Sequence, residues 1–188
     1  MILSYTYITA DELNRREARE RQSEASREML FAMLADAGIP EREIARDEKG
    51  RPYLVGRRDV DFNISHSENI AVCVLSAGEG RVGVDVERSK PLNEAHLARF
   101  ARRFFAPDEG VDASTVISAW TEKEAYLKYL GVGIATDLKS VRPKDDEDVR
   151  LEHLTVDGYS VTVCLDKNAT LGEARRFSPG KGSPKGEG

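Results

Sequence analysis

The sequence of 188 residues contains only two cysteines, Cys73 and Cys164, and each lies inside an apolar stretch. A small secreted domain held by disulfides needs more cysteines, so both are expected to be buried free thiols. No apolar run approaches the roughly 20 residues that span a bilayer. The first residues also lack the basic and apolar regions of a signal peptide. These absences predict a soluble, cytoplasmic protein without a membrane partner.

The sequence also lacks an excess of positive charge, because 28 Lys and Arg residues stand against 33 Asp and Glu residues. A net charge of −5 gives no basic field for a nucleic-acid backbone, so no nucleic-acid partner is expected. A Walker A loop and a set of zinc ligands are missing too. Residues 78–83 match G-x-G-x-x-G, but a strand follows them instead of a helix. They therefore predict a hairpin turn and not a dinucleotide site.

The residues that are present suffice for a core, since 40% are hydrophobic and 32% are charged. This composition fits one ordinary domain or two small halves that share a core. We expect helices over 11–38, 92–105 and 114–130, and strands over 1–9, 53–55, 69–75, 81–87, 149–154 and 159–165.

A weak internal repeat indicates how these elements are organised. Residues 26–39 and 121–134 each end a helical stretch in Gly-Ile, and an apolar strand with a cysteine follows each. Chance similarity is the open alternative. We predict an α+β fold of two pseudo-symmetric halves, each a small antiparallel sheet packed against a long helix, with a ligand cleft between them. The predicted parts are an N-terminal half (1–82), a C-terminal half (83–177) and a disordered tail (178–188).

Two acidic segments suggest chemistry. Asp85 and Glu87 lie two residues apart in a predicted strand, so both project from one face while valines occupy the other. Glu124 falls among apolar positions of a predicted helix, and Lys128 follows it by about one turn. Burying an ion is costly unless it is paired or bound to metal. Three converging carboxylates predict a Mg²⁺ site for a phosphate-bearing substrate.

Ordinary structural alternatives accompany each of these assignments. The two strand acids could face solvent, Glu124 could pair with Lys123 inside the protein, and Lys128 could form a surface ion pair. The segment 63–67, Asn-Ile-Ser-His-Ser, could be a phosphate-binding loop or a polar turn that bonds its own backbone. The arginines of residues 15–27 alternate with glutamates, which favours a solvated helix face.

In their order and spacing, the motifs resemble those of the 4′-phosphopantetheinyl transferase superfamily, specifically its larger, surfactin-synthetase-activating type with two halves. The matching stretches are residues 50–52, 62–67, 83–87, 103–105, 120–128 and 131–133. The resemblance covers about residues 20 to 166. Each motif alone is weak, and the combination is specific.

The resemblance implies the reaction of a holo-[acyl-carrier-protein] synthase. The 4′-phosphopantetheine group of coenzyme A would pass to a serine of an apo acyl or peptidyl carrier protein, with release of adenosine 3′,5′-bisphosphate. It implies that Asp85, Glu87 and Glu124 hold Mg²⁺ against the diphosphate of the coenzyme. Lys128 would hold that diphosphate and offset the charge that develops as the bond breaks.

The resemblance also implies the remaining roles. Arg51, Ser65 and His66 would contact phosphates of coenzyme A, and Arg21 and Arg27 are the candidates for its 3′-phosphate. Glu124, directly or through a metal-bound water, is the leading general base for the serine. A single chain with two halves implies a monomer.

Two other functions stay open at this point. One is a Mg²⁺-dependent phosphohydrolase that uses water as the nucleophile. The other is a non-catalytic module that binds coenzyme A or a carrier. The presence of all three acids together with Lys128 favours an enzyme.

Overall fold

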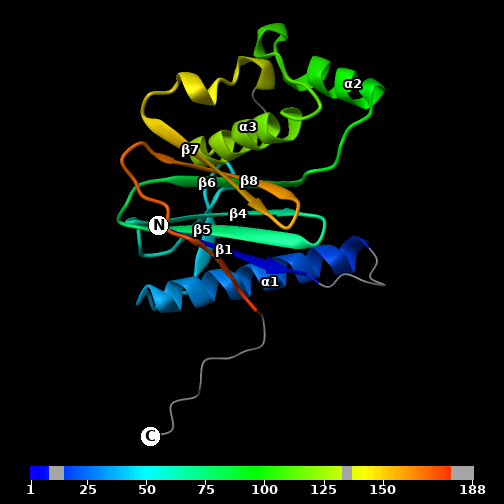
Figure 1. The fold of residues 1–188 in the computed structure, drawn as a ribbon. Coiled ribbons are helices and arrows are strands. Elements are labelled where there is room, and N and C mark those ends of the chain that lie inside the picture. The colour runs from blue at the N-terminus through cyan, green and yellow to red at the C-terminus, as the bar shows by residue number, and fades with distance from the viewer. Residues whose placement is uncertain (9–14, 133–136, 179–188) are drawn as a thin grey trace, which may run out of the picture.

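The computed structural model describes residues 1–8, 15–132 and 137–178. Figure 1 shows the order of its elements along the chain. They are β1 (Ile2–Tyr7), α1 (Arg15–Asp36), β2 (Ile44–Arg46), β3 (Pro52–Leu54), β4 (Val60–Ser67), β5 (Ile70–Ala77), β6 (Val82–Arg88), α2 (Glu94–Phe104), η1 (Pro107–Glu109), α3 (Val116–Leu130), η2 (Leu138–Ser140), η3 (Pro143–Asp145), β7 (Val149–Val156), β8 (Tyr159–Asp166) and β9 (Ala174–Arg176).

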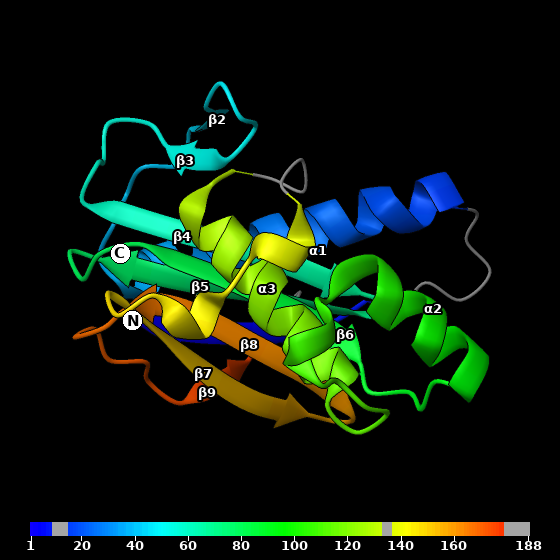
Figure 2. The same ribbon diagram turned by 90° about the horizontal axis from the view of Figure 1, so that it is seen from above.

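Two sheets lie between two long helices. In Figure 1, α1 covers the outer face of a sheet with the strand order β4-β5-β1-β9, and α3 covers the second sheet, ordered β6-β8-β7. The short ribbon of β2 and β3 lies beside β4, as Figure 2 shows from above. Helix α2 lies on the far side of α3 from the sheets. The fold is therefore a mixed α+β arrangement, as the sequence predicts.

The facing sides of the two sheets form the main core. Val72 and Val74 of β5 pack with Val84 of β6 and with Val161 and Val163 of β8, and all five are 1% exposed or less. Regular alternation along these strands puts one apolar residue in every two on the buried face. The hydrophobic effect thus holds the two sheets together.

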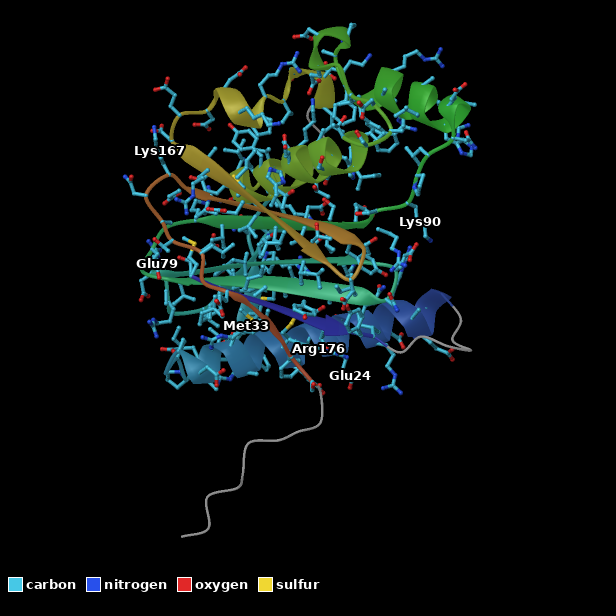
Figure 3. All side chains as sticks on the ribbon, viewed as in Figure 1. Glu24, Met33, Glu79, Lys90, Lys167 and Arg176 are labelled. Carbon is cyan, nitrogen blue, oxygen red and sulfur yellow. The ribbon has the colours of Figure 1, made fainter. Side chains whose placement is uncertain are left out.

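Only the second half of helix α1 packs closely against the first sheet. Met29, Leu30 and Leu34 are fully buried against the first sheet, while the arginine- and glutamate-rich first half is largely exposed. Figure 3 shows Met33 on the side of α1 that faces the sheet. Gly38 adopts a φ of +70° just after the helix, the left-handed conformation that commonly ends helices.

Most elements lie where the sequence predicts them. The predicted strands over 149–154 and 159–165 form a hairpin, in which Val156 pairs with Tyr159 around Asp157 and Gly158. Cys73 and Cys164 are buried free thiols, as expected, and burial raises the pKa of each. No helix within the described residues is long and apolar enough to cross a membrane.

Two local predictions are wrong. Residues 78–80 do not form a hairpin, because β5 and β6 belong to different sheets and the turn carries the chain between them. Residues 63–67 are neither a loop nor a turn, since β4 continues through them in register with β5. Strands β2, β4 and β9 are additional to the prediction. The predicted start of the first helix (11–14), the Gly-Ile at 133–134 and nearly all of the predicted tail lie outside the described residues.

Candidate active site

The candidate site begins where the edge strands of the two sheets meet. β6 is an outer strand of its sheet, so its outward backbone N–H groups need partners from elsewhere. Side chains of β4 provide them: Asp61 accepts a hydrogen bond from the N–H of Val82 at 2.9 Å, and Asn63 accepts one from the N–H of Val84 at 2.9 Å. Strand β4 thus holds β6 through its side chains.

The same row of β4 side chains continues onto two of the predicted metal ligands. Ser65 Oγ donates to Asp85 Oδ1 at 2.8 Å, and Ser67 Oγ donates to Glu87 Oε2 at 2.8 Å. The two hydroxyls therefore fix the direction in which both carboxylates project. Ser67 was not among the predicted site residues. The period-two alternation of polar residues along 61–67 was the signal for it.

Close packing of α3 on β6 brings the third acid to this point. Gly83 makes the approach possible, because a Cβ atom there would lie 2.1 Å from the carbonyl oxygen of Ala125 and 2.5 Å from the backbone nitrogen of Tyr129. Glu124 and Lys128 consequently come from the face of α3 that lies against β6.

Lys128 is bound directly to Asp85. Its Nζ donates to Asp85 Oδ1 at 2.6 Å, to Ser65 Oγ at 2.8 Å and to the carbonyl oxygen of Val84 at 3.1 Å. Asp85 is only 5% exposed. The alternative of a solvent-facing Asp85 with Lys128 in a separate surface pair is therefore wrong.

The carboxylates of this cluster carry oxygen atoms that remain available. Asp85 Oδ2 and Glu124 Oε1 are buried and have no hydrogen-bond partner among the described residues. Burial raises the pKa of Glu124, and the charge of Asp85 adds to the effect. Burial also raises the pKa of Glu87, again with a contribution from Asp85. Like charges are thus held close together, and an additional cation would relieve their repulsion.

This donor set fits a hard dication. Within the described residues, no three His, Cys, Asp or Glu side chains already stand in a metal-binding arrangement. However, buried carboxylate oxygens without partners are costly unless an ion binds them, and oxygen is the ligand that Mg²⁺ prefers. The residues that would hold the ion are Asp85, Glu87 and Glu124.

Lys123 has a separate, structural role. It is 1% exposed, and its Nζ donates to Glu109 at 2.9 Å and to the carbonyl oxygen of Leu138 at 2.7 Å. The Lys123–Glu124 pair considered as an alternative is therefore wrong, because Lys123 turns toward η1 and η2. Its contacts tie both short helices to α3.

Arg51 links three elements beside the cluster. Its guanidinium donates to Asp61 at 2.7 Å, to the carbonyl oxygen of Val82 at 2.8 Å and to that of Lys128. The side chain is 8% exposed. These contacts give Arg51 a bracing role between β4, β6 and α3, and they occupy the guanidinium that the resemblance assigns to a phosphate.

Two neighbouring pockets lie along β4, and of these two only the smaller is lined by a residue of the cluster, Lys128. The smaller, about 180 Å³, is lined by Arg51 and Lys128, and the larger, about 700 Å³, is lined by Arg27 and His66. Pro52, Asn63 and Ile64 line both pockets. Ser65 is buried beside Asp85 instead, and Arg21 is exposed on α1 and lines neither pocket.

The larger pocket contains two basic residues that sequence reasoning missed. Arg42 and Arg46 line it together with Arg27 and the ring of Phe31. Arg42 donates to the carbonyl oxygen of Ile39 at 2.5 Å, and Arg46 donates to that of Gly50 at 2.7 Å. No motif marks these arginines in the sequence. Only the path of the chain through β2 places them opposite α1.

The fold and the cluster define a mixed α+β protein with a carboxylate–lysine site beside a basic pocket. Residues 81–167 match the family model of the 4′-phosphopantetheinyl transferase superfamily. A 4′-phosphopantetheinyl transferase of Bacillus subtilis is 34% identical over 116 residues, which cover 56% of this chain and 49% of that relative. The 4′-phosphopantetheinyl transferase HetI of Nostoc sp. is 31% identical over 148 residues, or 68% of this chain and 61% of the relative.

A third relative is covered more fully. The 4′-phosphopantetheinyl transferase AcpT of Escherichia coli is 28% identical over 149 residues, which cover 74% of each chain. The chain spans about half to nearly two thirds of the length of the first two relatives named. All of these matches are to 4′-phosphopantetheinyl transferases, and the family model covers just under half of this chain.

Replacing Glu124 by glutamine is expected to stabilise the metal-free protein near pH 7 by about 1 kcal/mol, since one of the crowded buried charges is removed. The pKa of Glu124 is raised in the folded state, so proton uptake there favours folding. That contribution is full below the usual pKa of 4.5 and is lost as the pH rises through the raised value. The stability that Glu124→Gln gains over the wild type should therefore decrease as the pH is lowered.

Thermal unfolding in the presence of a chelator, measured near pH 7 and near pH 4, checks this expectation. Glu152→Gln is the matched control, because Glu152 pairs with Arg150 at an exposed position. A Glu124→Gln protein that is less stable than the wild type at neutral pH would contradict the charge crowding described above.

Proposed function

We propose that the protein transfers the 4′-phosphopantetheine group of coenzyme A to a serine of an apo acyl or peptidyl carrier protein. The observation that carries this proposal is the cluster of Asp85, Glu87, Glu124 and Lys128 at the seam of the two sheets, next to a basic pocket. Similarity to the 4′-phosphopantetheinyl transferase superfamily supports the same reaction.

The group transfer needs charge neutralisation more than covalent help from the protein. In this proposal, Asp85, Glu87 and Glu124 hold Mg²⁺, which would offset the negative charge of the diphosphate when bound. Lys128 lines the smaller pocket, so its ammonium can contact a diphosphate placed there. The burial of the cluster strengthens each of these interactions.

The chemical step is a displacement at phosphorus. The serine oxygen of the carrier bonds to the phosphorus that bears pantetheine. The bond from that phosphorus to the bridging oxygen breaks, and its electrons leave with adenosine 3′,5′-bisphosphate. Glu124 accepts the serine proton in this proposal.

The larger pocket is the proposed location of the nucleotide end of coenzyme A. Arg27, Arg42, Arg46 and His66 surround it and offer positive charge and hydrogen-bond donors to phosphate. Ser65 and Arg51 position the site without contacting the coenzyme in this proposal. Ser65 binds Asp85, and Arg51 binds the backbone carbonyl of Lys128. Arg21 is the weakest of the proposed phosphate contacts because it lines neither pocket.

The subtype and the organisation into halves are part of the same proposal. The larger, two-half type is supported by one long helix on each sheet and by the two pockets that Asn63 and Ile64 of β4 line. We propose that the two halves divide near residue 82 and that β9 returns to the sheet of the N-terminal half. We also propose a monomeric, cytoplasmic enzyme of the holo-[acyl-carrier-protein] synthase class. The comparisons favour neither a phosphohydrolase nor a binding module.

Incubation of the protein with coenzyme A, Mg²⁺ and a panel of apo carriers tests the function. We expect a mass gain of one phosphopantetheine on the carrier, observed by mass spectrometry, and no gain when the acceptor serine is replaced by alanine. Coenzyme A lacking its 3′-phosphate should react with a higher KM if the pocket arginines bind that group. Phosphate release without any modified carrier would instead support a phosphohydrolase.

A further inference from the structure

A cation supplied by the chain itself already neutralises part of the acidic cluster. Lys128 Nζ lies 2.6 Å from Asp85 Oδ1, so its positive charge opposes a second cation bound by the same carboxylate. One lysine faces three carboxylates, so it balances only one of their charges. Asp85 Oδ2 and Glu124 Oε1 stay without a partner among the described residues.

The two members of the ion pair differ in their freedom to move. The side chain of Asp85 is 7% exposed and is fixed by Ser65 on a central stretch of β6. The side chain of Lys128 is 28% exposed, ends a flexible stem and lines the smaller pocket. An anion that enters this pocket can therefore draw the ammonium away, whereas Asp85 cannot follow it.

We propose that Lys128 is a resident counter-ion of Asp85, and that a diphosphate ligand draws it away and frees the Asp85 carboxylate for a metal ion. Diphosphate and metal then bind cooperatively, because each favours the arrangement in which the Lys128–Asp85 contact is broken. The inference rests on the proposed function, which assigns both ligands to this site. It adds an order of binding, in which the metal ion binds weakly until coenzyme A is present.

Calorimetric titration with Mn²⁺ tests the proposal, first on the protein alone and then on protein saturated with coenzyme A. Mn²⁺ binding by the coenzyme itself is measured without protein and subtracted. For the wild type we expect Mn²⁺ affinity to rise by about tenfold or more when the coenzyme is bound. Lys128→Met should bind Mn²⁺ about tenfold more tightly than the wild type when alone, and coenzyme A should then add much less.

Matched variants separate counter-ion exchange from general electrostatics. Lys144→Met removes another lysine that is paired with an acid of α3, Glu122, at 2.9 Å, and it should leave both titrations unchanged. Ser65→Ala removes one of the acceptors that hold Lys128 and should shift both titrations in the direction of Lys128→Met, by less. Thermal unfolding of each variant confirms that it is folded.

The outcomes distinguish this inference from the function on which it rests. If Lys128→Met raises the Mn²⁺ affinity by the same factor with and without coenzyme A, the proposed displacement of Lys128 is overturned. Simple repulsion between Lys128 and the metal would act equally in both states. Wild-type affinity in Lys128→Met also overturns it, while transfer to a carrier would leave the proposed function standing. Absence of Mn²⁺ binding in every titration overturns the inference together with the proposed metal site.

Discussion

Asp85→Asn is expected to lower kcat/KM for carrier modification by about 10³-fold or more. Asp85 is the centre of the cluster, since it contacts Lys128 and Ser65 and its charge acts on Glu87 and Glu124. Asparagine keeps the shape of the side chain but removes the charge that would bind a dication and orient the lysine. The loss should appear mainly in kcat and in the concentration of Mg²⁺ required, measured by carrier mass gain over time.

Asp145→Asn provides the matched control for that measurement. Asp145 is exposed on η3, and it lies outside the cluster. Its replacement should leave the rate within about twofold of the wild type. An Asp85→Asn enzyme with near wild-type rates at the usual Mg²⁺ concentration would contradict the assignment of Asp85 as a metal ligand.

Gly83→Ala is the second change with a large expected effect. The added Cβ atom would meet the backbone of α3 at 2.1 Å and 2.5 Å, and backbone cannot rotate aside as a flexible side chain can. β6 and α3 must separate, which costs packing over their whole contact and moves Glu124 away from Asp85. We expect a loss of about 3 kcal/mol in the free energy of unfolding, together with nearly complete loss of transfer.

Chemical denaturation measures the stability part, and Gly78→Ala supplies the comparison. Gly78 has a φ of +83° and open space around its Cβ position, so alanine there meets only the backbone cost of about 1 kcal/mol. If Gly83→Ala were no more destabilising than Gly78→Ala, the close approach of α3 to β6 would be refuted as the basis of the site.

Much of the fold follows from periodicity in the sequence. Alternating valines at 82, 84 and 86 predict both the buried face of β6 and the common direction of Asp85 and Glu87, and the structure agrees. Glu124 is identifiable for the same kind of reason, because a charged residue at an apolar helical position must have a partner or a ligand.

What the sequence could not predict depends on contacts between distant segments. The Asn-Ile-Ser-His-Ser segment belongs to a strand, and its alternate residues have different neighbours. Ser65 and Ser67 contact β6, while His66 lines the larger pocket. The resemblance assigns Arg51 to a phosphate of coenzyme A. In the structure its guanidinium instead binds carbonyl and carboxylate oxygens from three separate elements. Such pairings are set by topology and not by local pattern.

The parallel pairing of β9 with β1 has a consequence for how the first sheet is completed. Leu3 and Ala174 are partners across this contact, although nearly the whole described chain lies between them (Figure 1). A nascent chain emerging from the ribosome therefore leaves one side of β1 unpaired until the second sheet and its helix have been synthesised. The first sheet therefore gains its last strand, β9, only after the second sheet and α3 have been synthesised.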